Sequence, residues 1–143
     1  MSFAIRIGAS KERTVNIDSN KTTSFLWEGE NVFSTPSMIS ELEETCRVLL
    51  KEQFVSDVEW DSVGTLVNVR HLASTPVGAQ VILKAEVISV EGRRVQFRVE
   101  AADNIEKIGD GTHERFLIHI PKFRARIQEK QKQLEAHEKG DKL

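Results

Sequence analysis

VFSTPSMISELEETCRVLLKE, residues Val32 to Glu52, decides the fold because it has the pattern of one long buried helix. Thr35 and Pro36 mark its start, since a threonine oxygen can accept from the free amides of a first turn and proline fits the first helical position. At about 100° per residue, the apolar side chains fall within an arc of roughly 120°. We expect this arc to face the core; its members are Met38, Ile39, Leu42, Cys46, Leu49 and Leu50.

One acidic residue of this helix, Glu43, departs from the amphipathic pattern. It lies about 20° beyond Leu50 on a helical wheel, whereas Glu41, Glu44 and Glu52 fall on the polar side. A carboxylate beside apolar surface either finds hydrogen-bond donors or has its pKa raised, and both outcomes suit a group that moves protons. The alternative is a glutamate whose stem covers the edge of the core while its carboxylate reaches water.

The composition is that of one soluble globular domain over residues 1–143. Hydrophobic residues make up 39% and charged residues 29%, and the net charge of −2 gives no reason to expect nucleic acid or an anionic membrane as a partner. No apolar run approaches the ~20 residues of a membrane span, and the first ten residues do not form a secretory signal. We therefore expect a cytoplasmic protein.

The single cysteine, Cys46, excludes an internal disulfide. Its place within the apolar arc favours a small core residue over a nucleophile. No Cys/His spacing typical of a metal site occurs in the sequence, so we expect no metal.

The rest of the chain predicts an antiparallel sheet. Glu91-Gly92 predicts a tight hairpin turn, because glycine accepts the positive φ that such a turn needs. Gly109 and Gly111 suggest a bulge or the close approach of another backbone or a ligand, and the Thr112–Arg115 run after them can also be a solvent-facing strand segment. Residues 53–62 form a polar connection. The predicted strands are 12–17, 63–73, 79–90, 94–102 and 105–120.

Strand 63–73 alternates so that His71 ends a mostly apolar face, together with Val63, Thr65, Val67 and Val69. That face should pack on the helix. A buried histidine more often satisfies a backbone partner than performs catalysis, so His71 alone is a weak indication of an active site.

Two flanking segments complete the prediction. Residues 22–31 cluster Phe25, Leu26 and Trp27, which either form a lid over a pocket or fill the core beside the helix. After Pro121 the dense alternating charge predicts a solvated helix over about 122–139, with a contact role at most. A curved antiparallel sheet wrapping one long helix is the α+β hotdog fold, here with a core of about 12–122. Its sheet edges favour a homodimer with a continuous sheet.

Four stretches resemble the hotdog acyl-CoA thioesterases of the fluoroacetyl-CoA thioesterase type: VFSTPSMISELEE, GTLVNVRHLASTPVG, SVEGRR and IGDGTHERFLIHIPKF. The resemblance covers about Thr14 to Phe123. It implies that three residues act together in catalysis, namely Thr35, Glu43 and His71. It also implies that Gly64 lies near the substrate carbonyl and that Arg115 lines the site.

The implied activity is hydrolysis of an acyl-CoA thioester without a cofactor, since coenzyme A is part of the substrate. Thr35 would attack the carbonyl or hold a water that does so, while His71 takes the proton and Glu43 orients the imidazole. Amides at the helix start or near Gly64 could hold the oxyanion. Thr35 and Glu43 are eight residues apart, about 12 Å along a helix, so either His71 bridges them or two subunits share the site.

Departures from the family pattern concern substrate choice. The stretch FLWEGENVF places Leu26 and Gly29 where the fluoroacetyl-specific enzyme has lid phenylalanines, and Pro36 and Glu44 replace its glycine and tryptophan. We therefore expect a short or medium acyl group, with Leu26 and Phe33 lining its pocket. The alternatives are a module that binds an acyl-CoA or acyl-carrier thioester without cleaving it and, third, a hotdog dehydratase or isomerase.

Overall fold

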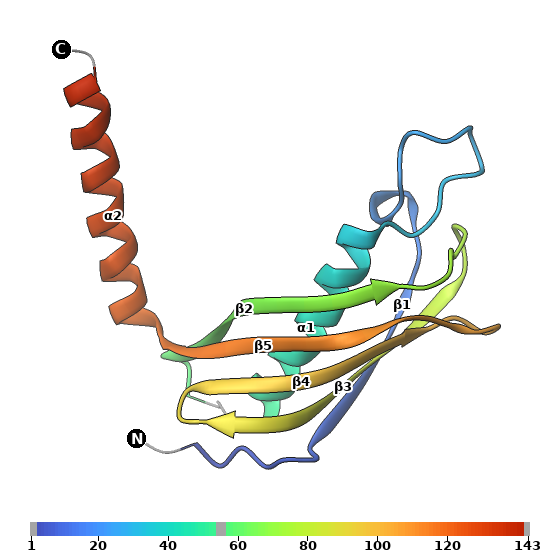
Figure 1. Cartoon of the computed structure of the whole chain (residues 1–143), viewed down its shortest axis with the longest axis horizontal. Coiled ribbons are helices and arrows are strands. Elements are labelled where there is room, and N and C mark those ends of the chain that lie inside the picture. Colours follow the sequence, from blue (N-terminus) through green and yellow to red (C-terminus); the bar gives the residue numbers. More distant parts are fainter. Residues whose placement is uncertain (1–2, 54–56, 142–143) are drawn as a thin grey trace.

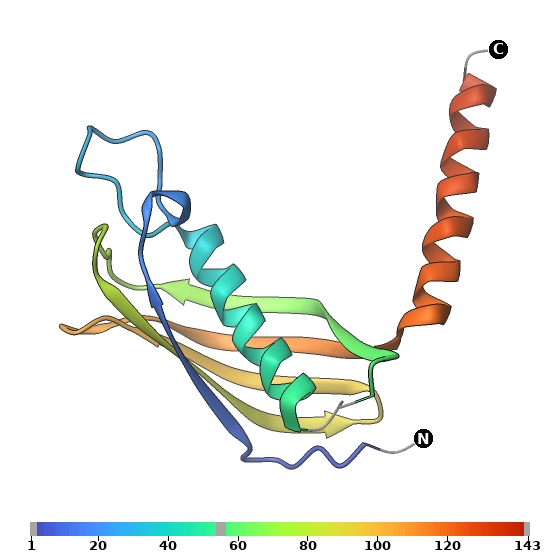
Figure 2. The same ribbon diagram turned by 180° about the vertical axis from the view of Figure 1, so that it is seen from behind.

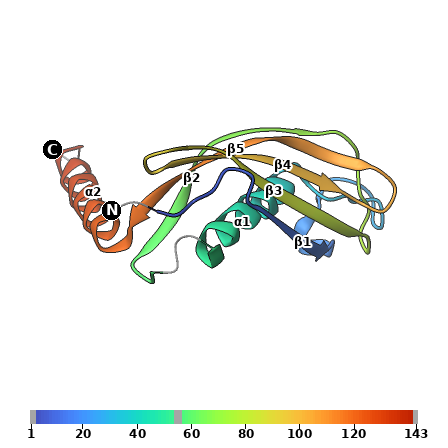
Figure 3. The ribbon, with the colours of Figure 1, turned by 90° about the horizontal axis from the view of Figure 1, so that it is seen from below.

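A curved five-stranded antiparallel sheet wraps one long helix in the computed structural model, which describes residues 3–53 and 57–141 (Figures 1 and 2). The strand order is β1-β3-β4-β5-β2, so β1 and β2 are the outer strands. Figure 3 shows helix α1 beneath the arch of the sheet. The predicted hotdog fold is thereby confirmed. Its elements are β1 (Ser10–Asn16), a short 3-10 turn (Ser19–Lys21), α1 (Thr35–Gln53), β2 (Trp60–His71), β3 (Gln80–Glu91), β4 (Arg94–Ala102), β5 (Lys107–His119) and α2 (Ile120–Asp141).

Helix α1 begins at Thr35, one residue before the predicted first helical position Pro36, and its cap is the preceding residue. The Ser34 hydroxyl accepts from the amide of Ser37 at 3.2 Å, and the Ser34 carbonyl accepts from the amide of Met38 at 2.9 Å. The expectation that Thr35 caps the helix is therefore wrong, because Ser34 already satisfies these amides. The Thr35 hydroxyl is left free for another partner.

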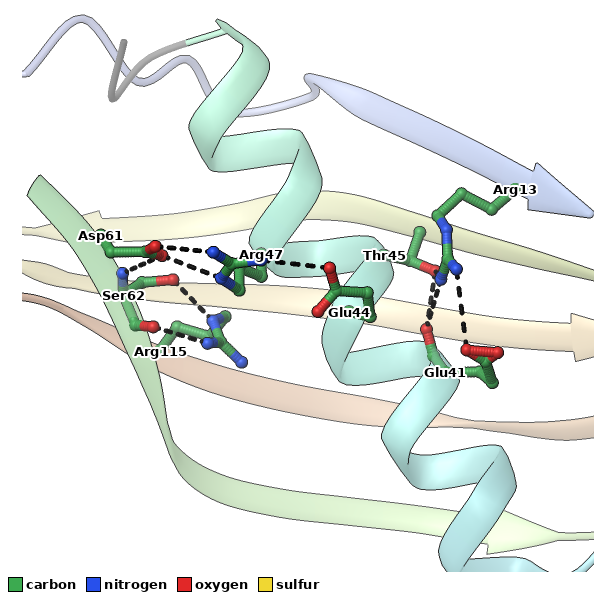
Figure 4. A network of polar contacts seen from close by, with 8 residues as sticks. All are labelled: Arg13, Glu41, Glu44, Thr45, Arg47, Asp61, Ser62 and Arg115. Atoms are coloured by element: carbon green, nitrogen blue, oxygen red, sulfur yellow. Dashed lines mark hydrogen bonds and ion pairs between the residues drawn. The ribbon is translucent and has the colours of Figure 1, made fainter. Parts of the chain in front are cut away.

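The predicted apolar arc of α1 faces the sheet, but Ile39 is less buried than expected and Thr45 is buried as well. Met38, Leu42, Cys46, Leu49 and Leu50 are buried, whereas Ile39 is only half-buried. Thr45 is buried in addition, because its hydroxyl donates to the Glu41 carbonyl at 2.8 Å and accepts from Arg13 at 3.1 Å (Figure 4). A hydroxyl whose hydrogen bonds are satisfied can enter a core at little cost.

Strands β3 and β4 supply the central inner face of the sheet. Every predicted inward residue is fully or almost fully buried: Val81, Leu83, Ala85, Val87, Val95, Phe97, Val99 and Ala101. Glu91 pairs with Arg94, so the two-residue hairpin loop is Gly92 and Arg93 rather than Glu91 and Gly92. Gly92 has φ +60°, the left-handed backbone that such a turn requires.

Strand β2 contains a bulge, since its register with β5 shifts between Gly64 and Leu66. Before the bulge, Gly64 pairs with the buried Arg115 and faces the helix. After it, Val67 pairs with the buried His113, so the odd-numbered residues up to His71 face the helix. The predicted inward face is therefore right from Val67 onward and wrong before it, because one extra residue at the bulge changes the parity.

Strand β5 runs unbroken past its two glycines, which allow close approaches as predicted. A Cβ on Gly109 would lie 2.6 Å from the Met38 sulfur, and a Cβ on Gly111 would lie 2.1 Å from the Asn68 carbonyl oxygen. Both positions therefore exclude larger residues.

Trp60 was expected in a polar connection, of which residues 54–56 lie outside the described residues. It instead begins β2 and is 6% exposed, packed against the rings of Phe3 and His119 with Arg93 stacked over its face. Helix α2 then leaves the end of β5 and projects away from the sheet (Figure 1). Neither helix of the described residues has the length and apolarity needed to cross a membrane.

Candidate active site

The N-terminus of α1 and the end of β2 bring Thr35 and His71 together. The Thr35 hydroxyl lies 2.7 Å from Nδ1 of His71, across 36 residues of sequence. Because Ser34 caps the helix, this hydroxyl has no competing role in the first turn. A hydroxyl in direct contact with an imidazole nitrogen is the arrangement that allows the nitrogen to take its proton.

A pocket of about 290 Å³ opens at this pair. Its walls include Thr35 and His71, together with Thr23 and Val32 from the segment before α1 and Ser74 after β2. Thr35 is exposed to the pocket, whereas His71 is partly buried. A ligand entering the pocket therefore meets the hydroxyl with the imidazole behind it.

Burial lowers the pKa of His71 below its usual 6.5, and the backbone of Ala73 partly offsets this effect. The neutral imidazole therefore predominates at neutral pH, which is the form that accepts a proton. In the tautomer whose Nδ1 accepts from Thr35, the second nitrogen carries the hydrogen. Nε2 is buried and has no hydrogen-bond partner among the described residues.

Glu43, Gly64 and Arg115 form a second group of predicted site residues. A Cβ on Gly64 would lie 3.1 Å from Oε1 of Glu43 and 3.6 Å from Nη1 of Arg115. The absence of a side chain at Gly64 thus lets the carboxylate and the guanidinium approach the middle of β2. The structure brings these three residues together.

Arg115 is 6% exposed and held by three contacts to two residues, Ser62 and His113. Its Nε donates to the Ser62 hydroxyl and its Nη2 to the Ser62 carbonyl, both at 2.7 Å. Its Nη1 lies 3.2 Å from Nε2 of His113, whose Nδ1 lies 2.8 Å from the Leu66 carbonyl. His113 therefore donates from Nδ1 and accepts at Nε2. The guanidinium is held in one orientation beside the bulge of β2.

His113 was not predicted as a site residue. The sequence left open that residues 112–115 are a solvent-facing strand segment. In the structure His113 is only 2% exposed, and its ring stacks on that of Phe97. Burial lowers the pKa of His113, and the nearby Arg115 charge adds to this, although the hydrogen bond to Leu66 opposes both. The alternation of side chains along the strand could have indicated its burial, because His113 and Arg115 lie on the same strand face as Leu117.

A network of polar contacts connects this second group to α1 (Figure 4). Arg47 donates to both carboxylate oxygens of Asp61, at 3.1 and 2.8 Å, and to Glu44 at 3.1 Å. Asp61 accepts in turn from the amide of Ser62 at 2.7 Å, next to the groups that hold Arg115. Burial raises the pKa of Asp61, but the bonds from Arg47 and Ser62 outweigh it and lower the pKa overall.

The two groups of site residues do not meet within one chain. Glu43 is two helical turns from Thr35, and Gly64 lies seven residues before His71 on β2. An extended strand rises about 3.3 Å per residue, so the ends of this stretch are roughly 20 Å apart. His71 therefore does not bridge Thr35 and Glu43 in one chain.

Of the remaining predicted site residues, Phe33 lines the pocket, whereas Leu26 is not among its lining residues. Phe33 is fully buried, and its ring meets that of His71 edge-on at 6.4 Å between centroids. Leu26 is half-buried in the segment before α1, where its amide donates to Asn31 at 3.2 Å. Phe33 thus supports the imidazole from the core side.

Cys46 is a core residue outside this group of site residues. Cys46 is fully buried, and burial raises the pKa of its thiol to about 12, so it stays protonated. The expectation of a core cysteine is confirmed. Within residues 3–53 and 57–141, no group of three or more His, Cys, Asp or Glu is placed to hold a metal ion.

The sequence and structure match proteins of known fold and activity. The model of the family described as fluoroacetyl-CoA-specific thioesterase matches residues 17–120. The fluoroacetyl-CoA thioesterase of Streptantibioticus cattleyicolor is 36% identical over 137 residues, covering 91% of this chain and 97% of that protein. A solved structure of the fluoroacetyl-CoA thioesterase superposes with a TM-score of 0.80 at 34% identity, covering 89% of this chain and 98% of that one.

More distant structures share the architecture. A thioesterase-superfamily member of Thermus thermophilus has a TM-score of 0.82 at 26% identity, covering 92% of this chain and 97% of its own. A hot-dog-like protein from Thermanaerovibrio acidaminovorans has a TM-score of 0.77 at 22% identity, and the match covers 87% of this chain and 91% of that one. At this identity the match shows the fold alone. With the family model matching most of its length, the chain belongs to the fluoroacetyl-CoA-specific thioesterase family of hotdog-fold thioester hydrolases.

Proposed function

We propose that this protein hydrolyses the thioester of a short or medium acyl-CoA, with Thr35 as nucleophile and His71 as its base. The observation that carries the proposal is the 2.7 Å contact between the Thr35 hydroxyl and Nδ1 of His71 at the pocket. Membership of a thioesterase family supports the reaction type. A module that only binds thioesters would have no need for an activated hydroxyl.

The reaction proceeds in two halves. In the first, Thr35 Oγ1 bonds to the carbonyl carbon while His71 Nδ1 takes the hydroxyl proton, and the carbon–sulfur bond then breaks. The coenzyme A thiolate leaves and receives that proton from His71. In the second, His71 takes a proton from a water that attacks the acyl-threonine. The bond from the carbonyl carbon to Thr35 Oγ1 then breaks, the acid leaves, and His71 returns the proton to the threonine oxygen.

The start of α1 offers a donor for the developing oxyanion. Pro36 has no amide hydrogen, and the amides of Ser37 and Met38 already donate to Ser34. The Thr35 amide is thus the first-turn donor that remains, at the positive end of the helix dipole. It belongs to the same residue as the nucleophile, which places it close to the attacked carbonyl.

We further propose that Glu43 of the partner subunit completes the site in a homodimer. Strand β2 is an outer strand whose Leu66 and Val67 are 53% and 40% exposed, which favours pairing with a second copy. Antiparallel self-pairing centred on Asn68 keeps helix-facing residues opposite helix-facing residues. The extra residue of the β2 bulge would then set His71 opposite the bulge that contains Gly64 of the partner subunit. The carboxylate beside that glycine would then approach the imidazole, whose Nε2 has no partner among the described residues of one chain.

The acyl group is proposed to be small. Solved complexes of variants of the fluoroacetyl-CoA thioesterase contain acetyl-CoA in one case, and fluoroacetate with CoA in another. A pocket of about 290 Å³ suits an acyl chain of a few carbons. Leu26 and Gly29 in the segment before α1 support a substrate other than fluoroacetyl-CoA.

Thiol release from a panel of acyl-CoA esters, short to long and including fluoroacetyl-CoA, tests the activity. We expect a preference for short or medium esters in the wild type and loss of turnover in His71→Ala and Glu43→Ala. Saturable binding of these esters without thiol release from any of them would instead identify a binding module.

Mixing the two inactive variants tests the shared site. A dimer of one His71→Ala chain and one Glu43→Ala chain would contain one complete site if the residues act across subunits. Equal mixing should then restore ~25% of wild-type turnover, since half of the dimers are mixed. No restoration, with mixed dimers shown by mass, would mean that Glu43 does not act across the interface.

A further inference from the structure

Helix α2 carries one apolar and basic face that its own chain leaves uncovered except at Phe123. From Pro121 to Gly140 every residue except Phe123 is exposed. Spacings of three and four residues place Phe123, Ile127, Lys130 and Leu134 within about 60° of the helix surface, with Arg126 at the border. Ile127 and Leu134 are 52% and 54% exposed. We refer to these five residues as the α2 face.

The segment before α1 has the complementary character. Between residues 22 and 34, Phe25 and Trp27 are 81% and 78% exposed, although each is a large aromatic side chain. The same segment contains Glu28 and Glu30 and no lysine or arginine. Clustered exposed aromatics of this kind mark contact surfaces, and the acidic residues match Arg126 and Lys130 of the α2 face.

The two surfaces lie at opposite ends of the same sheet edge. Figure 1 shows α2 rising past β2 at the end where this strand begins, and residues 22–34 rising past it where it finishes. In Figure 3 neither element covers the outer, convex face of the sheet. A two-fold axis that pairs β2 with its own copy exchanges these two ends. It would bring α2 of one copy beside residues 22–34 of the other.

We propose that the α2 face docks on residues 22–34 of the second copy and closes the outer wall of that copy's pocket. Thr23 and Val32 of this segment line the pocket that contains Thr35 and His71. Each subunit would therefore contribute part of the enclosure in which the other subunit's threonine reacts. The inference rests on the homodimer of the proposed function, because only paired β2 edges bring the two surfaces together.

Cross-linking of chains that each carry one introduced cysteine tests the contact directly. The native Cys46 is fully buried, so introduced cysteines react selectively. Chains with Glu28→Cys are mixed with differently tagged chains carrying Lys130→Cys, and the mixture is treated with a short bis-maleimide. We expect a covalent hetero-dimer. Lys132→Cys, on the opposite side of α2 from Lys130, is the matched control and should yield far less.

The dimer mass separates the two proposals. Sedimentation of each mixture reports whether the chains pair at all. Dimers of the correct mass in which Lys130→Cys links no better than Lys132→Cys would overturn the docking of α2 and leave the shared site intact. Chains that stay monomeric would overturn both.

A charge exchange tests the effect on the pocket. Lys130→Glu should raise KM by up to about fivefold with kcat kept, which corresponds to one exposed ion pair. Adding Glu28→Lys to the same chain should restore KM, because an acidic and a basic side chain then face each other again. Lys132→Glu should leave KM unchanged. A failure of the double variant to recover would contradict contact between these two surfaces.

Discussion

The Thr35 hydroxyl contacts Nδ1 of His71 at 2.7 Å because a neighbouring side chain has taken over the capping of the helix. The two residues come from the start of α1 and the end of β2, and the sheet fixes both. Capping and catalysis are thus divided between Ser34 and Thr35, which are adjacent in sequence. This division makes the two roles separable by mutation.

Thr35→Ala should lower kcat by at least about a hundredfold, because it removes the nucleophile that His71 activates. Thr35→Ser keeps the hydroxyl and should retain measurable turnover. Ser34→Ala is the control: it should cost about 1 kcal/mol of unfolding free energy through the lost cap, with kcat largely kept. Steady-state kinetics and urea unfolding measure these effects. Equal loss of kcat in Ser34→Ala would contradict the division of roles.

The pH dependence of kcat/KM should follow the neutral form of His71. Because burial lowers the pKa of this imidazole below 6.5, more than half of the imidazole is neutral at pH 6.5. Activity should therefore stay above half of its plateau at pH 6.5 and fall through its midpoint at a lower pH. Rates measured over pH 4.5–8, with circular dichroism to verify folding, give the midpoint. A midpoint above 6.5 would show that a charge near the imidazole, such as the Glu43 carboxylate of the partner subunit, outweighs the effect of burial.

Gly64→Ala should damage activity more than stability. The new Cβ would lie 3.1 Å from Oε1 of Glu43 and 3.1 Å from Cε1 of His113, so these groups must move. We expect on the order of a tenfold to hundredfold loss of kcat/KM and about 1–3 kcal/mol lower unfolding free energy. Gly140→Ala adds a Cβ in open space and should change neither. Wild-type kinetics in Gly64→Ala would show that the carboxylate position is not critical.

Cys46 should be inert in the folded protein. Its side chain is fully buried, and its thiol has a pKa of about 12, so almost no thiolate forms at pH 8. Iodoacetamide should leave the native chain unlabelled and fully active, and label it once per chain after unfolding in guanidinium. Intact mass spectrometry reads both states. Rapid native labelling would indicate that α1 opens away from the sheet.

The fold was predictable from the sequence because its strongest patterns are local. Helical spacing in α1 and the alternation of β3 and β4 give the buried faces of both layers correctly. His71 was placed on the inner face by the same alternation. The position of Thr35 at the helix start also follows from its Pro36 neighbour.

Long-range features escaped prediction for a physical reason. The burial of His113 and Thr45 depends on hydrogen bonds to Leu66 and Arg13, partners 47 and 32 residues away. The predicted inward face of β2 before the bulge was wrong because the extra residue becomes apparent only when β2 is paired with β5. The separation of Glu43 from His71 likewise emerges only in three dimensions.

The bulge in β2 also determines which changes of length this strand can tolerate. It lets Gly64, an even-numbered position, and His71, an odd-numbered one, both face the helix. Deleting Thr65 would restore regular alternation and keep both residues on that face. Inserting a residue between the bulge and His71 would instead turn the imidazole outward and present Arg70 to the helix. Related chains should therefore accept a one-residue loss at position 65 and reject a one-residue gain beyond it.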